Sequence, residues 1–496
     1  MIIRYMHLKY IINIPICIVS LLEQIDDGDT TTVKIAFTQE ANAELERYMY
    51  SKDNFVTVNG NMIRDISKEA FQTFYVMTKE PDAYSKEISD SDKQMFLDIG
   101  PDDITFTKLC NWFGSTINIE DNDKTKKVTS SRFNCNDIMT ITPTEFSMVK
   151  ETVHTTVGRF IFNKLLLFGS GFDNFIDYQN DVMVSGNIKK IEKMIVSALI
   201  DDKMTTKQMI HYIDTRNWLG LELHAVVTSS FSPAVSKLPK EVKDLKKKLL
   251  EENKEAIDKG DITVVDDIAK KLIDKEMEVL KGDYGLDLYQ SGARGSVGNH
   301  LKNMQIMRGA VYNSATGKYD IITNSLMDGL DKKDLAPHSN SIVIGSYARG
   351  IKTADSGYKT KELLAACGAE VLDPNKGSDC GSVRYLERLC TKEDINDFLY
   401  RYIIDGDKLV MLDRDNISKY YGKVVKMRSP QYCRGVNGNQ HVYCNVCMGD
   451  YFYKIDKLNV GLLSATITGV TMKASLAKFH DSQVKFYDID IDDMLV

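Results

Sequence analysis

The sequence predicts a mixed α+β protein of several domains that is mainly helical. Three observations lead to this prediction. The chain has 496 residues, and single hydrophobic cores rarely grow beyond about 250–300 residues. Residues 236–284 hold two long charged segments in which apolar residues recur every three or four positions, a spacing typical of amphipathic helices. Four cysteines have the spacing of a zinc site in a loop-rich region: Cys380, Cys433, Cys444 and Cys447.

Composition indicates a folded, soluble protein. Hydrophobic residues make up 43% and charged residues 27% of the chain, which excludes a fibrous or wholly disordered protein. The formal net charge is -7, so the chain is not a uniformly basic coat for nucleic acid, although local basic clusters can still bind phosphate. The nine cysteines, mostly isolated, predict reduced thiols and a cytoplasmic location. The apolar run 11–22 contains Pro15 and is too short to span a bilayer, so no membrane association is expected.

The first 150 residues predict two helices and an irregular region. Thr38 has the residue type of an N-cap, and the acids after it predict a helix that ends near Asn54. Residues 66–79, ISKEAFQTFYVMTK, predict a second helix. Residues 83–150 mix polar residues with short strand-like runs such as DIMTITP, so little regular structure is expected there.

Residues 238–261 and 262–283 predict an antiparallel helical hairpin. A Lys-Gly-Asp turn separates the two segments. The apolar positions form one stripe that would pack inward while the rest is solvated; they are Leu245, Leu249, Leu250, Val265, Ile268 and Leu272. The simplest interpretation is a protruding two-helix arm held by that stripe.

Two later stretches are rich in small residues. Residues 290–309, QSGARGSVGNHLKNMQIMRG, combine a small-residue loop with basic side chains, which suits close approach to phosphate, although an ordinary loop can have this composition. Residues 350–370, GIKTADSGYKTKELLAACGAE, predict a helix that small residues interrupt. Gly357 would cost that helix about 1 kcal/mol relative to alanine, so we expect either close helix packing or a bend there.

Cysteine spacing predicts a tetrahedral zinc site. Cys444 and Cys447 form a CxxC knuckle, Cys433 precedes Cys444 by eleven residues, and Cys380 lies in a Ser-Asp-Cys-Gly turn upstream. Four thiolates satisfy Zn²⁺, and a closed site would stabilise a region with little core. Buried free cysteines are the alternative, and His441 is the best substitute ligand.

Taken together, these stretches resemble one protein family. SGARGSVGNHLKNMQIMRG and, about forty residues later, GIKTADSGYKTKELL resemble the loop before the bridge helix and the bridge helix itself in the largest (beta-prime) subunit of multisubunit DNA-dependent RNA polymerases. TTVGRFIFNKLL (155–166) is similar to the stretch after that family's catalytic loop, and residues 238–281 fall where the family has rim helices. SLAKFH (475–480) resembles its first trigger-loop helix, and all four cysteines match its zinc site. The resemblance covers about residues 25–480.

The resemblance implies a DNA-directed RNA polymerase, a nucleotidyltransferase that is active only with partner subunits. The implied partners are an N-terminal beta-prime fragment, beta-like chains, a DNA template, RNA and nucleoside triphosphates, and the implied ions are structural Zn²⁺ and catalytic Mg²⁺. Arg294 and Arg308 would contact phosphate without reading sequence. Five residues of the bridge helix would face the template and the incoming nucleotide: Lys352, Thr353, Ala354, Gly357 and Tyr358.

The stretch IDDGDTTT (25–32) is the part of the resemblance that concerns Mg²⁺. The family's catalytic loop reads Asp-any-Asp-Gly-Asp, and its carboxylates hold the ion. Aligned on the glycine, Asp27 and Asp29 take the second and third positions, Ile25 takes the first, and Asp26 lies one residue out of register. A polar turn is the alternative, whereas an EF-hand is excluded because its ligand positions are not filled.

At the other end of the resemblance, His480 keeps the position of the trigger-loop histidine, where it would contact the triphosphate and act as a general acid.

The resemblance also divides the chain, as follows: 1–24, unmatched extension; 25–150, segment after the catalytic loop; 151–235, active-site region; 236–284, rim hairpin; 285–370, loop and bridge helix; 371–450, zinc-binding clamp region; 451–496, first trigger-loop helix and tail.

The unmatched first 24 residues and the early end of the trigger-loop region resemble a beta-prime subunit that is split near its active site, as in giant bacteriophages. On this interpretation the polymerase transcribes phage genes in the cytoplasm of a bacterial host. A different class of protein stays open: a non-catalytic, zinc-containing nucleic-acid-binding or assembly factor descended from such a subunit. Ile25 favours that alternative, and the intact KTADSGY segment favours the enzyme.

Overall fold

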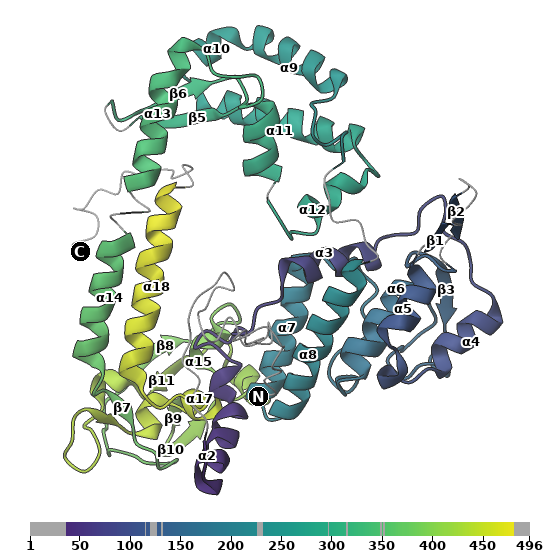
Figure 1. The fold of residues 1–496 in the computed structure, drawn as a ribbon. Coiled ribbons are helices and arrows are strands. Elements are labelled where there is room, and N and C mark those ends of the chain that lie inside the picture. Colours follow the sequence, from purple (N-terminus) through teal and green to yellow (C-terminus); the bar gives the residue numbers. More distant parts are fainter. Residues whose placement is uncertain are drawn as a thin grey trace. The chain divides into compact units, whose positions relative to one another are not determined.

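The computed structural model describes residues 36–480 except 115, 120–125, 130–131, 226–231, 296, 314–315, 348–349 and 351–352. The chain divides into two compact units, Met1–Asp244 with Leu272–Leu301 and Leu245–Lys271 with Lys302–Val496. Both contain helices, and short strands accompany them (Figure 1). The predicted mixture of helix and sheet is therefore confirmed. Among the described residues, no helix has both the length and the apolar character that a membrane crossing requires.

The first unit is a group of helices with two small antiparallel strand pairs. Its helices are α2 (Gln39–Met49), α3 (Lys68–Met77), α4 (Asp90–Asp98), α5 (Phe106–Phe113), α6 (Val157–Phe162), α7 (Ser185–Ile200), α8 (Thr206–Glu222) and α12 (Asp287–Gln290). Its strands are β1 (Thr116–Ile119) with β2 (Lys126–Thr129) and β3 (Ile138–Ile141) with β4 (Val153–Thr156). The helix predicted over 66–79 is confirmed as α3. The first helix ends at Met49, earlier than predicted, because Ser51 caps a separate 3₁₀ turn, Lys52–Asn54.

The core of the first unit forms where α3 packs on α8. Gly220 of α8 lets the helices approach, since a Cβ there would lie 2.3 Å from the Cβ of Ala70. Oγ1 of Thr73 donates to the carbonyl of Gly220 at 2.9 Å. The rings of Phe74 and Phe162 meet edge to face with centroids 5.4 Å apart, which joins α3 to α6.

Three helices occupy the predicted hairpin region: α9 (Lys240–Glu252), α10 (Lys254–Asp258) and α11 (Ile262–Val279). The turn after α10 includes Gly260 at φ +81°, a conformation that glycine adopts without strain. Of the predicted stripe, Val265, Ile268 and Leu272 are buried, whereas Leu245, Leu249 and Leu250 are half-buried. The helices are thus confirmed, and their antiparallel packing stays a prediction because residues of α9 and α11 fall in both units.

The second unit combines long helices with short strands. Its helices include α13 (Lys332–Tyr347), α14 (Thr353–Cys367), α15 (Ile395–Phe398), α16 (Asn445–Met448), α17 (Tyr451–Lys454) and α18 (Val460–His480). β5 (Gly309–Asn313) pairs with β6 (Lys318–Ile322), and β7 (Val371–Leu372) pairs in parallel with β12 (Val442–Tyr443). A four-stranded antiparallel sheet has the order β10-β9-β11-β8, formed by Lys408–Met411, Tyr402–Asp405, Val424–Met427 and Leu386–Leu389.

Short 3₁₀ and π segments complete the described structure. The 3₁₀ segments after Lys52–Asn54 are Pro101–Asp103, Leu223–Ala225, Tyr284–Leu286, Ile417–Tyr420 and Pro430–Tyr432. The π-helical segments are Asn163–Phe168 and Val297–Ile306. The second π segment covers part of the small-residue loop, which was predicted as a loop.

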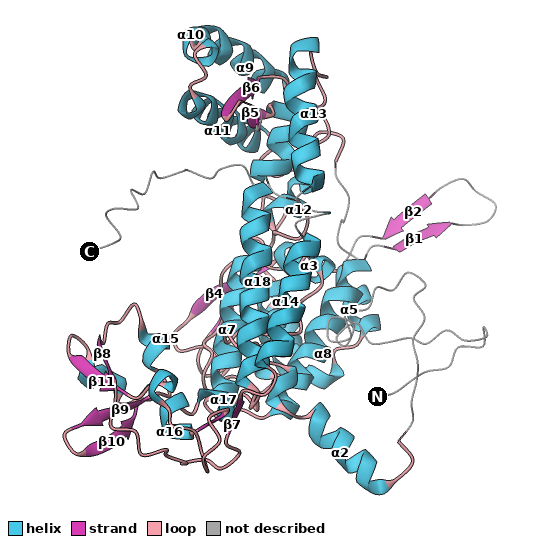
Figure 2. Ribbon diagram, turned by 90° about the vertical axis from the view of Figure 1, so that its left-hand side faces the viewer, coloured by secondary structure: helices cyan, strands magenta, loops and turns pink. Residues whose placement is uncertain are grey.

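Helices α14 and α18 lie side by side in both views (Figures 1 and 2). They run antiparallel, since Gly461 lies against Cys367 and Gly469 lies against Thr360. Strands β7 to β11 lie toward the end of this pair where α18 begins, whereas β5 and β6 lie beside α13 (Figure 2). The helix predicted over 350–370 is therefore α14, with a partner that the sequence analysis did not assign to it.

Candidate functional site

The four cysteines predicted as a metal site lie together in the second unit. Their Sγ atoms all lie within 4.8 Å of one another. Cys380 and Cys447 are 3.6 Å apart, and Cys433 and Cys444 are 3.8 Å apart, between sulfur atoms. Four sulfurs around one Zn²⁺ at about 2.3 Å lie about 3.8 Å from each other in a tetrahedron. The donor set and its spacing therefore fit a zinc ion.

The local fold brings the four thiols together through a turn and a short helix. Cys444 is the N-cap of α16, and its sulfur accepts the backbone N–H of Cys447 at 3.4 Å. The sulfur of Cys433 accepts the N–H of Cys444, also at 3.4 Å. Asn445 connects α16 to the turn before Cys380, because its Oδ1 accepts the N–H of Gly377 at 2.7 Å. Backbone donors that point at sulfur favour the thiolate form, which is the form that binds metal.

The electrostatics of the cluster also suit a metal. The hydrogen bond from Cys447 lowers the pKa of the Cys444 thiol to about 5, because the thiolate accepts it. Cys447 holds the shared proton, so its own pKa is raised. Zn²⁺ competes with such protons for sulfur. Arg428 also donates to the sulfur of Cys447, at 3.2 Å.

His441 is not part of this cluster. Its Nδ1 lies 2.6 Å from Oε1 of Glu370, and its side chain is 64% exposed. This hydrogen bond lowers the pKa of Glu370. Because four sulfurs already surround one point, the substitute role considered for His441 is not needed.

Two glycines that the sequence analysis missed set the spacing of α14 and α18. A Cβ on Gly461 would lie 1.7 Å from the carbonyl oxygen of Cys367, and one on Gly469 would lie 2.5 Å from Oγ1 of Thr360. Their separation by eight residues, about two helical turns, was the available signal, because it places both on one helix face.

The bridge-helix residues of the sequence analysis fall on or beside α14. Ala354 and Tyr358 are exposed, Tyr358 by 62%. A Cβ on Gly357 would meet no atom within 4 Å, so the expectation of close helix packing there is wrong for the described residues. Thr353 begins α14, and Lys352 lies outside the described residues.

The two predicted phosphate-binding arginines have different environments, each within its own unit. In the first unit, Arg294 forms an ion pair with Glu69. In the second, Arg308 is half-buried, and its buried Nε has no hydrogen-bond partner among the described residues. Burial lowers the pKa of Arg308. Burial and the neighbouring Arg308 charge also lower the pKa of His338. Arg308 is therefore the better candidate for an anion that comes from outside the chain.

His480 is the last residue of α18. The candidate Mg²⁺ ligands Asp26, Asp27 and Asp29 lie outside the described residues.

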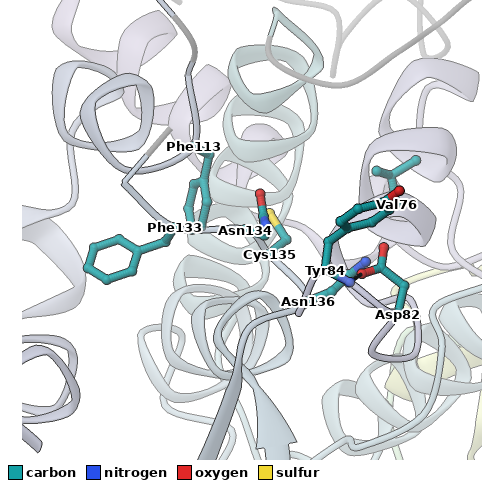
Figure 3. A pocket seen from close by; sticks show the side chains of 8 residues that line it. All are labelled: Val76, Asp82, Tyr84, Phe113, Phe133, Asn134, Cys135 and Asn136. Atoms are coloured by element: carbon teal, nitrogen blue, oxygen red, sulfur yellow. Dashed lines mark hydrogen bonds between the residues drawn. The ribbon is translucent and has the colours of Figure 1, made fainter. Parts of the chain in front are cut away.

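A cavity of about 460 Å³ lies in the first unit (Figure 3). Its lining is Val76, Asp82, Tyr84, Phe113, Phe133, Asn134, Cys135 and Asn136. Figure 3 shows Cys135 between the Phe113 and Phe133 rings on one side and Tyr84 on the other. Burial raises the pKa of the Cys135 thiol to about 12, so this thiol is a poor nucleophile. The cavity contains no residue predicted for the site.

The chain is similar over most of its length to proteins named DNA-directed RNA polymerase subunit beta'. The one from Finegoldia magna is 23% identical over 485 residues, which cover 88% of this chain and 36% of the relative. The one from Ruthia magnifica is 23% identical over 492 residues, 88% of this chain and 32% of the relative. The one from Ureaplasma urealyticum is 30% identical over 193 residues, 32% of this chain and 14% of the relative.

The chain thus spans about a third of the length of the curated relatives that it matches over most of its own length. No protein-family model matches it. A similarity that covers 88% of the chain includes residues of both compact units.

Proposed function

We propose that this chain is a beta-prime-like subunit of a multisubunit DNA-directed RNA polymerase, and that it takes part in template-directed ribonucleotide polymerisation. The observation that carries the proposal is similarity to beta-prime subunits over 88% of the chain. The low identity fits a diverged source such as a bacteriophage, whose polymerase would act in the cytoplasm of its host. Other polymerase subunits, DNA, RNA and nucleoside triphosphates are the partners in this proposal.

Helix α14 is the segment that would face the template and the incoming nucleotide. Ala354, Gly357 and Tyr358 share one side of the helix, since residues three and four apart are neighbours on a helix surface. The open space beside Gly357 supports this role, because no packing within the described chain requires a glycine there. Tyr358 offers an exposed ring for stacking on a base. Lys352 and Thr353 complete this proposed surface.

Arg308 is the stronger of the two candidate arginines for a contact to phosphate. Its half-buried guanidinium has a buried Nε without a partner, and such a group gains more from an incoming anion than a guanidinium that is already paired. Arg294 would have to leave Glu69 before it could bind phosphate. We therefore expect substitution of Arg308 to weaken nucleic-acid binding more than substitution of Arg294.

Zn²⁺ in the cluster would be structural, because four thiolates leave no open position for a substrate. It would join the turn around Cys380 to α16 and so stabilise the part of the second unit that has short elements. Mg²⁺ is assigned to the loop with Asp26, Asp27 and Asp29, together with a partner chain. His480 would donate a proton to the leaving pyrophosphate.

A non-catalytic, zinc-containing binding factor is the second candidate function. The position that Ile25 takes in the proposed Mg²⁺ loop favours it, since isoleucine offers no oxygen ligand. This candidate and the polymerase both include the zinc site, so zinc content cannot distinguish them, whereas RNA synthesis can.

The test uses the chain purified with its partners from its native source, through a tag. Mg²⁺-dependent incorporation of ribonucleotides on a DNA template is measured for the unaltered chain, Gly357→Ala, His480→Ala and the control Gly186→Ala. Gly186 lies in α7 with nothing within 4 Å of its Cβ position, so it is a matched helical glycine away from the proposed surface. We expect both Gly357→Ala and His480→Ala to lower the rate about tenfold or more, and Gly186→Ala to leave it unchanged. A purified complex that makes no RNA would favour the binding factor.

A further inference from the structure

Arg428 is buried against the sulfur atoms of the cysteine cluster. It directly follows β11, and its side chain is 4% exposed. Its Nη2 donates to Cys447 Sγ at 3.2 Å and lies 3.7 Å from Cys380 Sγ. The same guanidinium bonds Asp379 through both terminal nitrogens, at 2.6 and 3.4 Å. One side chain thus touches two of the four sulfurs and the residue before Cys380.

The charge of the cluster explains why a cation at this place matters. Zn²⁺ with four thiolates has a formal charge of -2, and a buried charge is unfavourable unless it is paired and hydrogen-bonded. Cys444 and Cys447 are fully buried, so water does little to solvate that charge. The Arg428 guanidinium brings a positive charge into direct contact with the sulfurs. An arginine side chain stays protonated in proteins, so this charge persists.

The backbone fixes Arg428 in this position. Its N–H donates to the carbonyl of Tyr402 at 2.9 Å, and its carbonyl accepts Nη2 of Arg401 at 3.1 Å. Arg401 is the nearest comparable cation, but its contact with Cys447 is to the carbonyl oxygen at 3.5 Å and not to the sulfur. Asp379 is 33% exposed, so its own charge is partly screened by solvent. The charged group that contacts the sulfurs is the guanidinium.

We propose that Arg428 retains the metal in the cysteine cluster, by compensating the charge of the zinc–thiolate centre and by holding Cys380 and Cys447 in their ligating positions. This inference rests on the zinc site of the proposed function. Arg428 is a positioning residue and not a ligand, because a guanidinium has no lone pair to offer a metal. Residues that orient metal ligands change metal affinity about 10–100-fold when they are substituted.

The experiment compares zinc retention in four full-length chains: the unaltered chain, Arg428→Met, Arg428→Lys and the control Arg434→Met. Arg434 is exposed and follows the ligand Cys433, so its substitution removes one positive charge near the cluster without removing a side-chain contact to sulfur. Each chain is loaded with one equivalent of Zn²⁺. Zinc content and the rate of transfer to a coloured chelator are then measured at one fixed pH.

We expect zinc to leave Arg428→Met at least tenfold faster than the unaltered chain, and Arg434→Met to match the unaltered chain. Arg428→Lys should be intermediate, since lysine keeps the charge but loses the fork that reaches Asp379 and sulfur together. Equal rates for Arg428→Met and the unaltered chain would overturn the inference while the zinc site stands. If Arg428→Met does not fold, the rate of zinc loss from Arg428→Lys is compared with that from the unaltered chain. Faster loss supports the inference, and equal rates overturn it. An unaltered chain that binds no zinc would overturn the zinc assignment, and the inference with it.

Discussion

Gly461 of α18 lies directly against the carbonyl oxygen of Cys367 at the end of α14, where a Cβ would come within 1.7 Å of that oxygen. The oxygen belongs to the backbone, so it cannot turn aside as a side chain would. Eight residues further along α18, Gly469 lies against the side chain of Thr360, where a Cβ would come within 2.5 Å of Oγ1. Two helices that are far apart in the sequence therefore touch at two glycines, and Gly461 is the one that faces backbone.

Gly461→Ala is expected to destabilise the second unit by about 1–3 kcal/mol, the usual range for an overpacked contact. Alanine normally stabilises a helix relative to glycine by about 0.5–1 kcal/mol, so a loss of stability would show that the contact with α14 dominates. The free energy of unfolding from denaturant titration measures it. An increase in stability would show that α14 and α18 do not touch at Gly461.

Gly357→Ala should have the opposite effect on stability. Because nothing described lies within 4 Å of a Cβ there, the substitution should raise the free energy of unfolding by about 0.5–1 kcal/mol through helix propensity alone. Denaturant titration of the isolated chain is the measurement, with Gly186→Ala in α7 as a second open helical glycine. A more stable chain that makes less RNA would separate a functional need for Gly357 from a structural one.

Cys447→Ser should abolish stoichiometric zinc binding, since it removes one of four thiolates from a closed site. Cys110→Ser is the control, because Cys110 lies in α5, outside the cluster. Zinc content of the purified proteins, measured by elemental analysis, should fall well below one per chain for Cys447→Ser and stay at one for Cys110→Ser. Equal content in both variants would mean that the cluster is not the zinc site.

The buried pair of Arg216 and Glu192 predicts a large stability effect in the first unit. Arg216 is fully buried, and besides Glu192 it bonds the carbonyls of Arg64 at 3.1 Å and Asp65 at 3.2 Å. Arg216→Met should lower the free energy of unfolding by about 3–5 kcal/mol, because the carboxyl of Glu192 is left buried without its partner.

Adding Glu192→Gln to Arg216→Met should recover part of that loss, since burial already raises the pKa of Glu192 and a neutral group costs less to bury. Denaturant titration of both variants gives the comparison. A double variant no more stable than the single one would assign the effect of Arg216 to the two backbone carbonyls.

Features with a local signal could be predicted from the sequence. The helix over 66–79, the helices of residues 236–284 and the helix over 350–370 each depend on spacing within a short stretch. About a hundred residues separate α14 from α18 in the sequence, and no periodicity in either helix shows which helix is its partner. The signal that existed, two glycines eight apart, has meaning only when the facing helix is known.

The candidate site also contains some residues that the sequence could predict and others that it could not. Cys380 lies more than fifty residues before Cys433. The sequence still predicted that both belong to one site, because a structural zinc ion needs four ligands and cysteine thiolates supply them. No sequence pattern identifies Arg428 as a contact of the cysteine cluster, because any of the chain's many arginines could approach the sulfurs. The open space beside Gly357 could not be predicted from the sequence either, because a glycine in a helix is equally consistent with close packing and with open space.

Glu276 in α11 predicts a pH dependence of stability. Its carboxyl group is buried, and neither oxygen has a hydrogen-bond partner in the part of the chain that the structure describes. Burial raises its pKa from 4.5 to about 7. The unfolded chain ionises this group near pH 4.5, whereas the folded chain keeps it protonated until about pH 7. Its contribution to stability is therefore most favourable below pH 4.5 and declines as the pH rises to about 7.

Glu276→Gln should remove this dependence, since glutamine has a similar shape and no charge. Relative to the unaltered chain, the variant should gain about 1–3 kcal/mol of stability between pH 4.5 and pH 8. Glu278→Gln is the matched control, because Glu278 lies in the same helix, is exposed and pairs with Lys275 at 3.0 Å. Denaturant titrations at both pH values decide the matter: a gain common to both variants would mean that the pH dependence does not arise from the burial of Glu276.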